Sequence, residues 1–262
     1  MIKRIISRLY VGLIVLFLYA PILILIVLSF NKSKSRAKWG GFTLHWYKEL
    51  FQNENIMNAL TTTLIIAFLS AIIATVIGTA ASIAINSMRK TPKTILISIT
   101  NIPMLNADIV TGISLMLVFV AVRFTLGFSS VLLAHITFNI PYVILSVMPK
   151  LRQLNPHTFE AALDLGATPL YAFFKVILPD IFSGVISGFF LAFTMSLDDF
   201  VITYFTKGPE VNTLSTIIYT EVKKGIKPEI YALSTLMFTS VLLLLVLINR
   251  KNAGKSAPMR KF

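Results

Sequence analysis

The chain has 262 residues, of which 56% are hydrophobic and 13% are charged, and its mean hydropathy is +0.80. Because soluble domains carry about 25% charged residues, this composition argues against a water-soluble enzyme and suits a bundle of about six membrane spans. The net charge of +13 comes from Lys and Arg residues that lie between apolar runs, which is typical of lipid contacts and topology signals rather than of nucleic-acid binding. The sequence has no cysteine, which excludes disulfides, thiolate metal sites and cysteine nucleophiles.

Six apolar runs alternate with polar segments along the chain, and we predict one membrane-spanning helix for each. The expected spans are 9–30, 60–85, 95–122, 131–147, 181–206 and 230–248. The first run follows three basic residues, as a signal peptide does, but it is too long and lacks a small-residue cleavage site, so we expect an uncleaved helix. The sequence therefore predicts an all-α, polytopic membrane protein with a single transmembrane domain over residues 1–262.

The distribution of basic residues predicts the orientation of this bundle. Six spans place both termini on one side, and 14 of the 24 Lys and Arg residues fall on that side. The positive-inside rule then favours cytoplasmic termini, although four basic residues between 32 and 38 crowd the first outer loop. The loops leave no soluble domain large enough for separate catalysis.

A polar segment at 150–180, between the fourth and fifth expected spans, contains the signals of a first short helix. Asn155 can cap this helix, Pro156 can begin it and Gly166 lies just past its end. It has a small, partly apolar surface, formed by Phe159, Ala161, Ala162 and Leu165. Such a surface can dock into a groove of another protein.

A second helix is expected in the same segment, after the glycine turn. Thr168 can cap it, Pro169 can begin it and Pro179 is expected to end it. The alternative interpretation of the whole segment is an ordinary amphipathic linker on the cytoplasmic side of the membrane.

This segment resembles the EAA motif of the permease subunits of ABC importers. The resemblance lies in Glu160, Ala161 and Ala162, in Gly166 after three further residues, and in Leu178 and Pro179 at the far end. One departure is Val176, where the motif usually has Ile. The resemblance implies the type I ABC importer permease (MetI-like) fold. In that family the loop inserts into a cytoplasmic ATPase dimer, and the implied coupling residues are Glu160, Ala161, Ala162, Asp164 and Gly166.

Further segments extend the resemblance over nearly the whole chain. They are SFN from Ser29, WYKELF from Trp46, HITFNIPYV from His135 and SLDDFVITYFTKGP from Ser196. Together they are similar to PotC-type permeases of spermidine/putrescine importers. The resemblance implies a non-enzymatic transport subunit of the bacterial inner membrane, without a cofactor of its own. Its implied partners are an ATPase that binds ATP and Mg, a second, PotB-like permease subunit, an extracytoplasmic polyamine-binding protein and membrane lipid.

Three aspartates lie within or at the edge of the apolar runs, and they fit a cationic cargo. A carboxylate inside a membrane is costly and usually faces a water-filled path, so we expect Asp108, Asp198 and Asp199 to attract ammonium groups. Adjacent helical residues point about 100° apart, so one aspartate of the pair should face the path and the other should bind a neighbouring helix or subunit. Tyr204 and Tyr219 could add cation-binding faces.

The alternative roles of these residues are structural. The aspartates could cap broken helices or pair with Arg123 or Lys207, and the tyrosines could pack against lipid or core. His135 and Asn139 lie four residues apart on one helical face, and we favour a structural hydrogen bond there over metal binding.

The segment 212–228, on the outer side, predicts a capped amphipathic helix at the membrane surface. In the family such outer loops meet the substrate-binding protein, and the alternative is a surface loop without a partner. Three rival functions also stay open. One is the same fold with another cargo, such as ferric ion, thiamine or phosphonate. The others are a stand-alone secondary transporter or channel, and a structural membrane protein.

Overall fold

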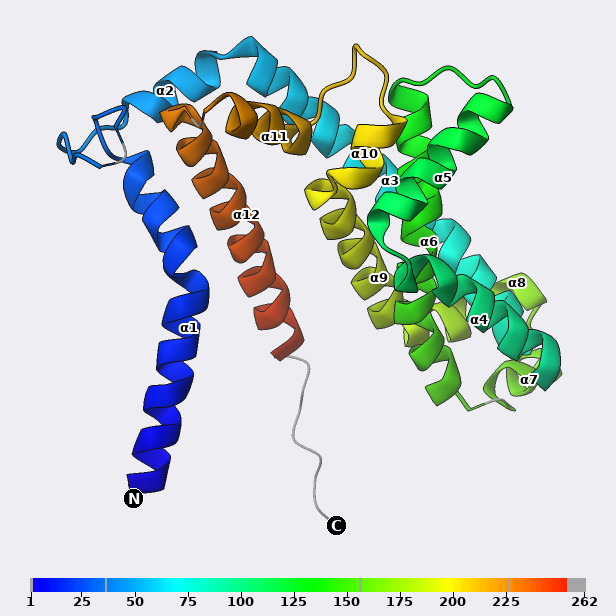
Figure 1. The fold of residues 1–262 in the computed structure, drawn as a ribbon. Helices are drawn as coiled ribbons and strands as arrows, with labels where there is room; N and C mark the ends of the chain where they lie inside the picture. Colours follow the sequence, from blue (N-terminus) through cyan, green and yellow to red (C-terminus); the bar gives the residue numbers. More distant parts are fainter. Residues whose placement is uncertain (1, 36, 156, 226, 254–262) are drawn as a thin grey trace. The chain divides into compact units, whose positions relative to one another are not determined.

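A computed structural model describes residues 2–35, 37–155, 157–225 and 227–253, and almost all of them are helical (Figure 1). The helices are α1 (Ile2–Ser29), α2 (His45–Gln52), α3 (Glu54–Ser87), α4 (Lys90–Leu105), α5 (Asp108–Ala121), α6 (Phe128–Gln153), α7 (His157–Asp164), α8 (Pro169–Ala172), the π-helical turn η1 (Phe173–Ile177), α9 (Leu178–Asp198), α10 (Val201–Thr206), α11 (Leu214–Lys224) and α12 (Pro228–Ala253). The expected all-α class is therefore confirmed. The chain divides into two compact units, Met1–Met57 with Ile218–Phe262, and Asn58–Ile217.

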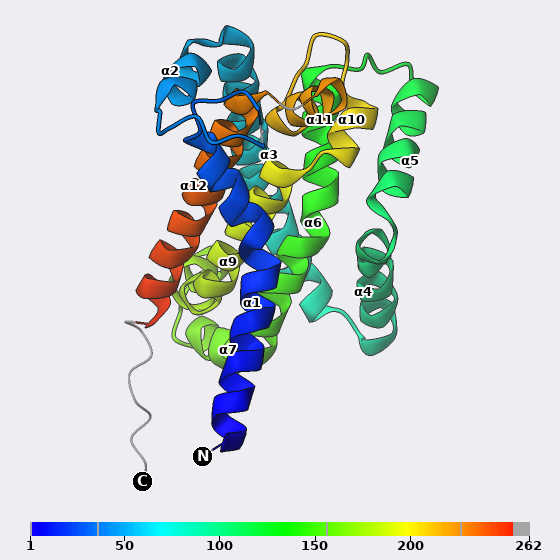
Figure 2. The ribbon, with the colours of Figure 1, turned by 60° about the vertical axis from the view of Figure 1, so that its left-hand side comes forward.

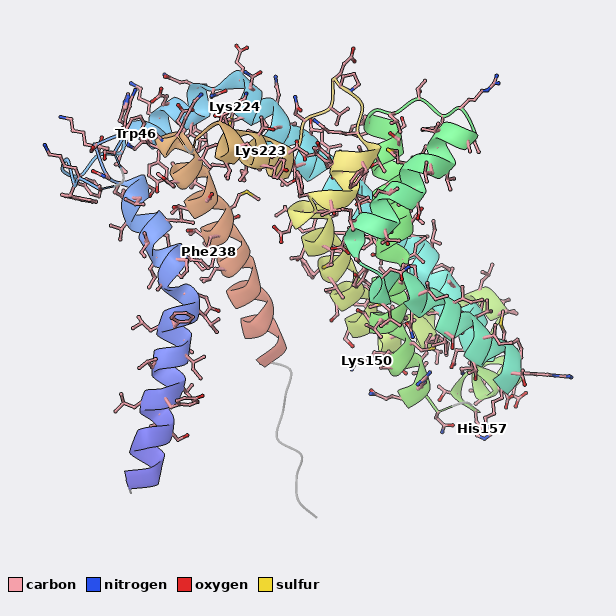
Figure 3. The ribbon with its side chains drawn as sticks, viewed as in Figure 1. Trp46, Lys150, His157, Lys223, Lys224 and Phe238 are labelled. Carbon is pink, nitrogen blue, oxygen red and sulfur yellow. The ribbon has the colours of Figure 1, made fainter. Side chains whose placement is uncertain are left out.

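In the first unit, α12 packs against α1 and α2. The C-terminal end of α1 continues into a short loop that pairs Asn31 with Phe42 in an isolated antiparallel bridge. Trp46 of α2 lies beside this loop (Figure 3) and is buried. The rings of Phe30 and Phe42 stack 5.1 Å apart. Apolar side chains cover α1 and are mostly exposed, as expected for a helix that faces lipid or another subunit.

In the second unit, α6 is the central helix and contacts α4, α5, α9 and α10 (Figure 2). Its longest contact is with α9, where Val143, Val147 and Ile181 are fully buried. Gly184 and Gly188 let α9 approach α6 closely, because a Cβ at Gly184 would lie 3.0 Å from the Ser146 carbonyl oxygen. Small residues at such crossings are typical of helix packing in membranes.

The expected spans are long, apolar helices in most but not all cases. Four described helices are long and apolar enough to cross a membrane, 7–29, 54–87, 128–153 and 169–198, and a bent pair would make five. The sixth expected span, 230–248, lies within α12, but many of its side chains fall outside the described residues. The number of six spans therefore stays a prediction.

The expected span 95–122 is not one helix, which corrects the prediction. It is divided between α4 and α5, which meet at an angle of 105° around Asn106 and Ala107. The backbone of both residues is extended, with ψ angles of 151° and 136°. Hydropathy alone did not detect the break, because both helices lie within one predominantly apolar run of the sequence.

Two further boundaries differ from the expectation. The span 181–206 is interrupted after Asp198, where Asp199 is extended and α10 begins two residues later. Pro179 does not end a helix but lies in the first turn of α9. The π-helical turn η1 makes this possible: the N–H of Leu178 bonds to the carbonyl of Phe173, and the longer turn accommodates a proline that lacks an N–H.

Candidate functional site

The segment between α6 and α9 folds as two short helices joined by a glycine turn. The N–H of Gly166 bonds to the Leu163 carbonyl at 2.9 Å, and the N–H of Ala167 bonds to the Ala162 carbonyl at 3.1 Å. This pair of bonds is a Schellman motif, which requires a left-handed residue after the helix. Gly166 supplies it with a φ of +86°. The expected end of the first helix is therefore confirmed; Pro156, its expected first residue, lies outside the described residues.

The second helix of the segment begins as the sequence predicts. Thr168 caps α8, since its hydroxyl oxygen accepts a bond from the Tyr171 N–H, and Pro169 occupies the first turn. From Pro169 the chain then stays helical through η1 and α9 as far as Asp198. The chain therefore runs from α8 into α9 without a non-helical residue.

The surface of the segment is exposed and partly apolar. Leu165 is 89% exposed, and Leu170, Tyr171 and Phe174 are exposed on the following turns. A shallow hollow lies between the two short helices and is lined by Ala162, Leu165, Gly166, Ala167, Thr168, Tyr171 and Val176. An apolar surface of this kind, at the end of a bundle, marks an interaction site.

The residues implied as coupling residues lie together on this surface. Glu160, Ala161, Asp164 and Gly166 are exposed, and Ala162 is half-buried beside the hollow. The carboxylate of Glu160 contacts Nδ1 of His157 at 3.2 Å, and both side chains are more than two-thirds exposed. Such an exposed pair contributes little stability, so Glu160 is able to exchange this contact for a partner.

The second candidate site contains the aspartates of the apolar runs, and they occupy different environments. Asp108 is exposed at the start of α5, directly after the 105° break. Asp198 is exposed and is the last residue of α9. The Asp199 side chain, in contrast, is only 8% exposed. Tyr204 and Tyr219 are 48% and 36% exposed.

Asp199 is held at the break between α9 and α10. Its Oδ1 accepts a bond from the Ile202 N–H at 3.2 Å, and its Oδ2 accepts from the N–H and the hydroxyl of Thr203 at 2.8 and 2.9 Å. The same Oδ2 lies 3.4 Å from Nε2 of His135 on α6. Lys207 donates to Asn212 instead of pairing with an aspartate.

His135 and Asn139 make structural hydrogen bonds, although not with each other. His135 bonds to Ser196 of α9 and Thr203 of α10 through its two ring nitrogens, at 2.5 and 2.9 Å. Asn139 donates to the Ser70 hydroxyl at 3.4 Å. The hydroxyl residues of this network were not singled out from the sequence, since single Ser and Thr residues in apolar runs give no signal of their own.

The segment predicted as a capped amphipathic helix contains α11, and two hydroxyls bind the N–H groups at its start. The N–H of Thr213 bonds to the Thr216 hydroxyl, and the N–H of Leu214 bonds to the Thr63 hydroxyl, both at 2.9 Å. Leu214 is buried, whereas Val222 is 47% exposed, so the apolar residues of this helix are not equally covered.

Comparisons with solved structures identify the fold. The chain superimposes on a subunit of a bacterial ABC transporter that imports the acidic polysaccharide alginate, with a TM-score of 0.72, 16% identity and 98% of both chains covered. It also matches the MetNI methionine ABC transporter with a TM-score of 0.62 and 18% identity, over 79% of this chain and 100% of the other. At these identities the likeness shows the fold alone, which is that of ABC importer permeases.

Sequence comparisons are more specific. The chain is 40% identical to the spermidine/putrescine transport system permease protein PotC of Haemophilus influenzae, over 90% of this chain and 93% of the relative. It is also 40% identical to the putrescine transport system permease protein PotI of Escherichia coli, over 86% and 83%. Residues 75–251 match the family described as "binding-protein-dependent transport system inner membrane component". The chain belongs to this family, and it is a multi-pass permease subunit of the inner membrane rather than an enzyme.

Proposed function

We propose that this chain is a permease subunit of an ABC importer that takes up polyamines, spermidine or putrescine. The observation that carries the proposal is the identity of 37 to 40% with polyamine permeases over most of the chain. These relatives are matched over 86 to 94% of this chain, whereas the alginate and methionine transporters, at 16% and 18% identity, match it in fold only.

The chemistry of a polyamine fits the exposed carboxylates. A polyamine carries two to four ammonium groups, and each is costly to remove from water unless an anion or an aromatic face replaces the lost hydration. Asp108 and Asp198 are exposed at helix ends within apolar stretches, and Tyr204 is exposed near the second of them in sequence. We assign these three residues to the path of the cargo, whereas Asp199, whose oxygens accept bonds from α10, has the structural role of the pair. Ferric ion and thiamine, which are also cationic, are the alternative cargoes.

The coupling role is assigned to the helix–glycine–helix segment. In this proposal Glu160, Ala161, Ala162, Asp164 and Gly166 dock on a separate ATPase dimer that binds ATP and Mg, and α8 passes its motion to α9. A periplasmic protein is seen with the alginate transporter, in a complex that holds an alginate pentasaccharide. We propose that this chain works with an extracytoplasmic polyamine-binding protein and with a second, PotB-like permease subunit. We further propose that both of its termini are cytoplasmic.

The test is uptake of labelled spermidine by cells that lack their own polyamine importers and receive this chain with its neighbouring subunits. Uptake is expected with the native chain. Glu160→Ala should abolish uptake without preventing assembly, and Asp198→Asn should reduce it. Asp180→Asn, at an exposed acid in the first turn of α9 outside the proposed coupling residues, serves as a control for loss of one charge near the coupling surface. A native complex that assembles with its ATPase and moves neither spermidine nor putrescine would refute the polyamine assignment but not the permease assignment.

A further inference from the structure

We propose that His135 is a positioning residue for transport: it holds the break between α9 and α10 around Asp199, so that Asp198 is the carboxylate presented to a cationic cargo. The inference deepens the proposed function and rests on it, because it concerns the same polyamine path. His135 lies in α6, the central helix of its unit, and is only 2% exposed.

His135 contacts both sides of the break. Nδ1 bonds to the hydroxyl of Ser196, in the last turn of α9, and Nε2 bonds to the hydroxyl of Thr203, in the first turn of α10. Ser196 and Thr203 are 3% and 0% exposed. A single rigid ring thus fixes the distance between two helix ends that the backbone alone would leave free to hinge.

The hydrogen bonds around this ring form a directed chain. The Thr203 hydroxyl donates its hydrogen to Asp199 Oδ2, so it must accept from His135, and Nε2 therefore carries a proton. On the other side, Ser70 donates to Ser196 at 3.1 Å, which leaves the Ser196 hydrogen for Nδ1 of a neutral His135. Asn139 donates to Ser70 and begins the chain. His135, Ser196 and Thr203 each have partners on both sides, whereas Oδ1 of Asn139 has no hydrogen-bond partner within the described residues. Buried hydrogen-bond networks of this kind rigidify a site.

The series of hydrogen bonds ends at the Asp199 carboxylate, whose two oxygens are both bonded. Both of its oxygens accept bonds from the beginning of α10, and its backbone carbonyl accepts from the Ser215 hydroxyl at 2.7 Å. A carboxylate at a helix start is stabilised by the unpaired N–H groups there. Asp199 is therefore satisfied within the protein, and an ammonium group could reach it only by displacing these partners.

Asp198 differs from Asp199 in each of these respects. It is exposed, and within the described part of the chain its carboxylate has no hydrogen-bond or ion-pair partner. Because it ends α9 while Asp199 is already extended, the direction of Asp198 depends on how the break is held. His135 holds the break without contacting the cargo, which is why its role is positioning.

The first test measures geometry and needs no cargo. Because the chain has no cysteine, Asp198→Cys and Asp199→Cys each introduce a unique thiol. A positively charged methanethiosulfonate is applied to vesicles that contain the assembled complex. The chain is then isolated through an affinity tag, and the rate at which its thiol has reacted is measured. Position 198 should react about tenfold or more faster than position 199. His135→Leu should reduce this ratio at least severalfold, whereas His135→Gln, which keeps one donor and one acceptor, should preserve it.

Unchanged thiol reactivity at position 198 in His135→Leu would overturn the proposal. If His135→Leu fails to assemble, Thr203→Val replaces it, since valine has the shape of threonine and removes only the hydroxyl that joins His135 to Asp199. Thr137→Val is the matched control. The Thr137 side chain is exposed on α6, the helix of His135, and its hydroxyl bonds only to the Leu133 carbonyl. This control should leave the ratio unchanged.

The second test is a double-mutant cycle on spermidine uptake. His135→Leu should lower uptake about tenfold in the native background and have little further effect in the Asp198→Asn background, since it acts through Asp198. Equal fold losses in both backgrounds would show a merely structural role and overturn the proposal. If even the native complex takes up no polyamine, the proposed function fails, while the thiol measurements still decide whether His135 controls the exposure of position 198.

Discussion

The indole N–H of Trp46 donates a hydrogen bond of 2.7 Å to the backbone carbonyl oxygen of Asn31. The side chain of Asn31 in turn organises the loop that follows it, because its Oδ1 accepts from the Gly40 N–H at 2.8 Å and its Nδ2 donates to the Lys38 carbonyl at 3.0 Å. A polar, basic loop is thus folded around one asparagine, and that asparagine is anchored to α2 through a buried tryptophan.

Trp46→Phe should therefore loosen this loop. The substitution leaves the Asn31 carbonyl without its donor, which costs about 1–3 kcal/mol for a buried group. We expect trypsin to cleave at the exposed lysines of the loop faster than in the native complex. Trp39→Phe is the matched control, because Trp39 is 54% exposed and should tolerate the change. Equal cleavage rates in the two variants would contradict the anchoring role of Trp46.

Gly166→Ala tests the turn of the coupling segment. A side chain in the left-handed region costs roughly 1–2 kcal/mol, and here it would strain the joint between α7 and α8. We expect reduced coupling, measured as less cargo moved per ATP hydrolysed. Gly127→Ala is the control: a Cβ at either glycine meets nothing within 4 Å, but Gly127 is extended, with a φ of 178°. A loss of the same size in both variants would show that conformation is not the cause.

Gly184→Val tests the close crossing of α6 and α9. Its Cβ would lie 2.8 Å from Cγ of Lys150 and 3.0 Å from the Ser146 carbonyl oxygen, so the helices would have to separate. Overpacking of this kind costs about 1–3 kcal/mol. The thermal midpoint of the detergent-solubilised complex should fall. Gly12→Val, where a Cβ meets nothing within 4 Å, should leave the midpoint nearly unchanged, and a comparable fall there would argue against the crossing.

The sequence was sufficient to predict features that depend on local chemistry. The glycine turn at Gly166 and the cap at Thr168 were predicted because each follows from the preferences of the residues at that position. The long apolar helices were also predicted. Hydrophobicity is summed over about 20 residues, so a few polar residues do not change the prediction of a span.

The helix breaks could not be predicted from the sequence. The end of α9 at Asp198 depends on Asp199 bonding to the next helix and on His135, which is far away in sequence and reaches it only through the packing of α6. Likewise the turn between α4 and α5 lies within a predominantly apolar run. The two residues at the turn, Asn106 and Ala107, are neither proline nor glycine, so they give no signal of a break. The sequence predicts that one of Asp198 and Asp199 faces the path and the other binds a neighbouring helix or subunit, but only the tertiary structure shows that Asp199 is the one bound within the protein.

The most direct test of the account is transport by the purified complex in proteoliposomes. The chain, its second permease subunit and its ATPase are reconstituted with ATP trapped on the ATPase side, and labelled spermidine is supplied outside with the binding protein. We predict that spermidine accumulates, that unlabelled putrescine competes and thiamine or phosphonate does not, and that Glu160→Ala abolishes accumulation in an intact complex. Accumulation of thiamine, phosphonate or ferric ion in place of spermidine, with the complex intact, would contradict the central claim.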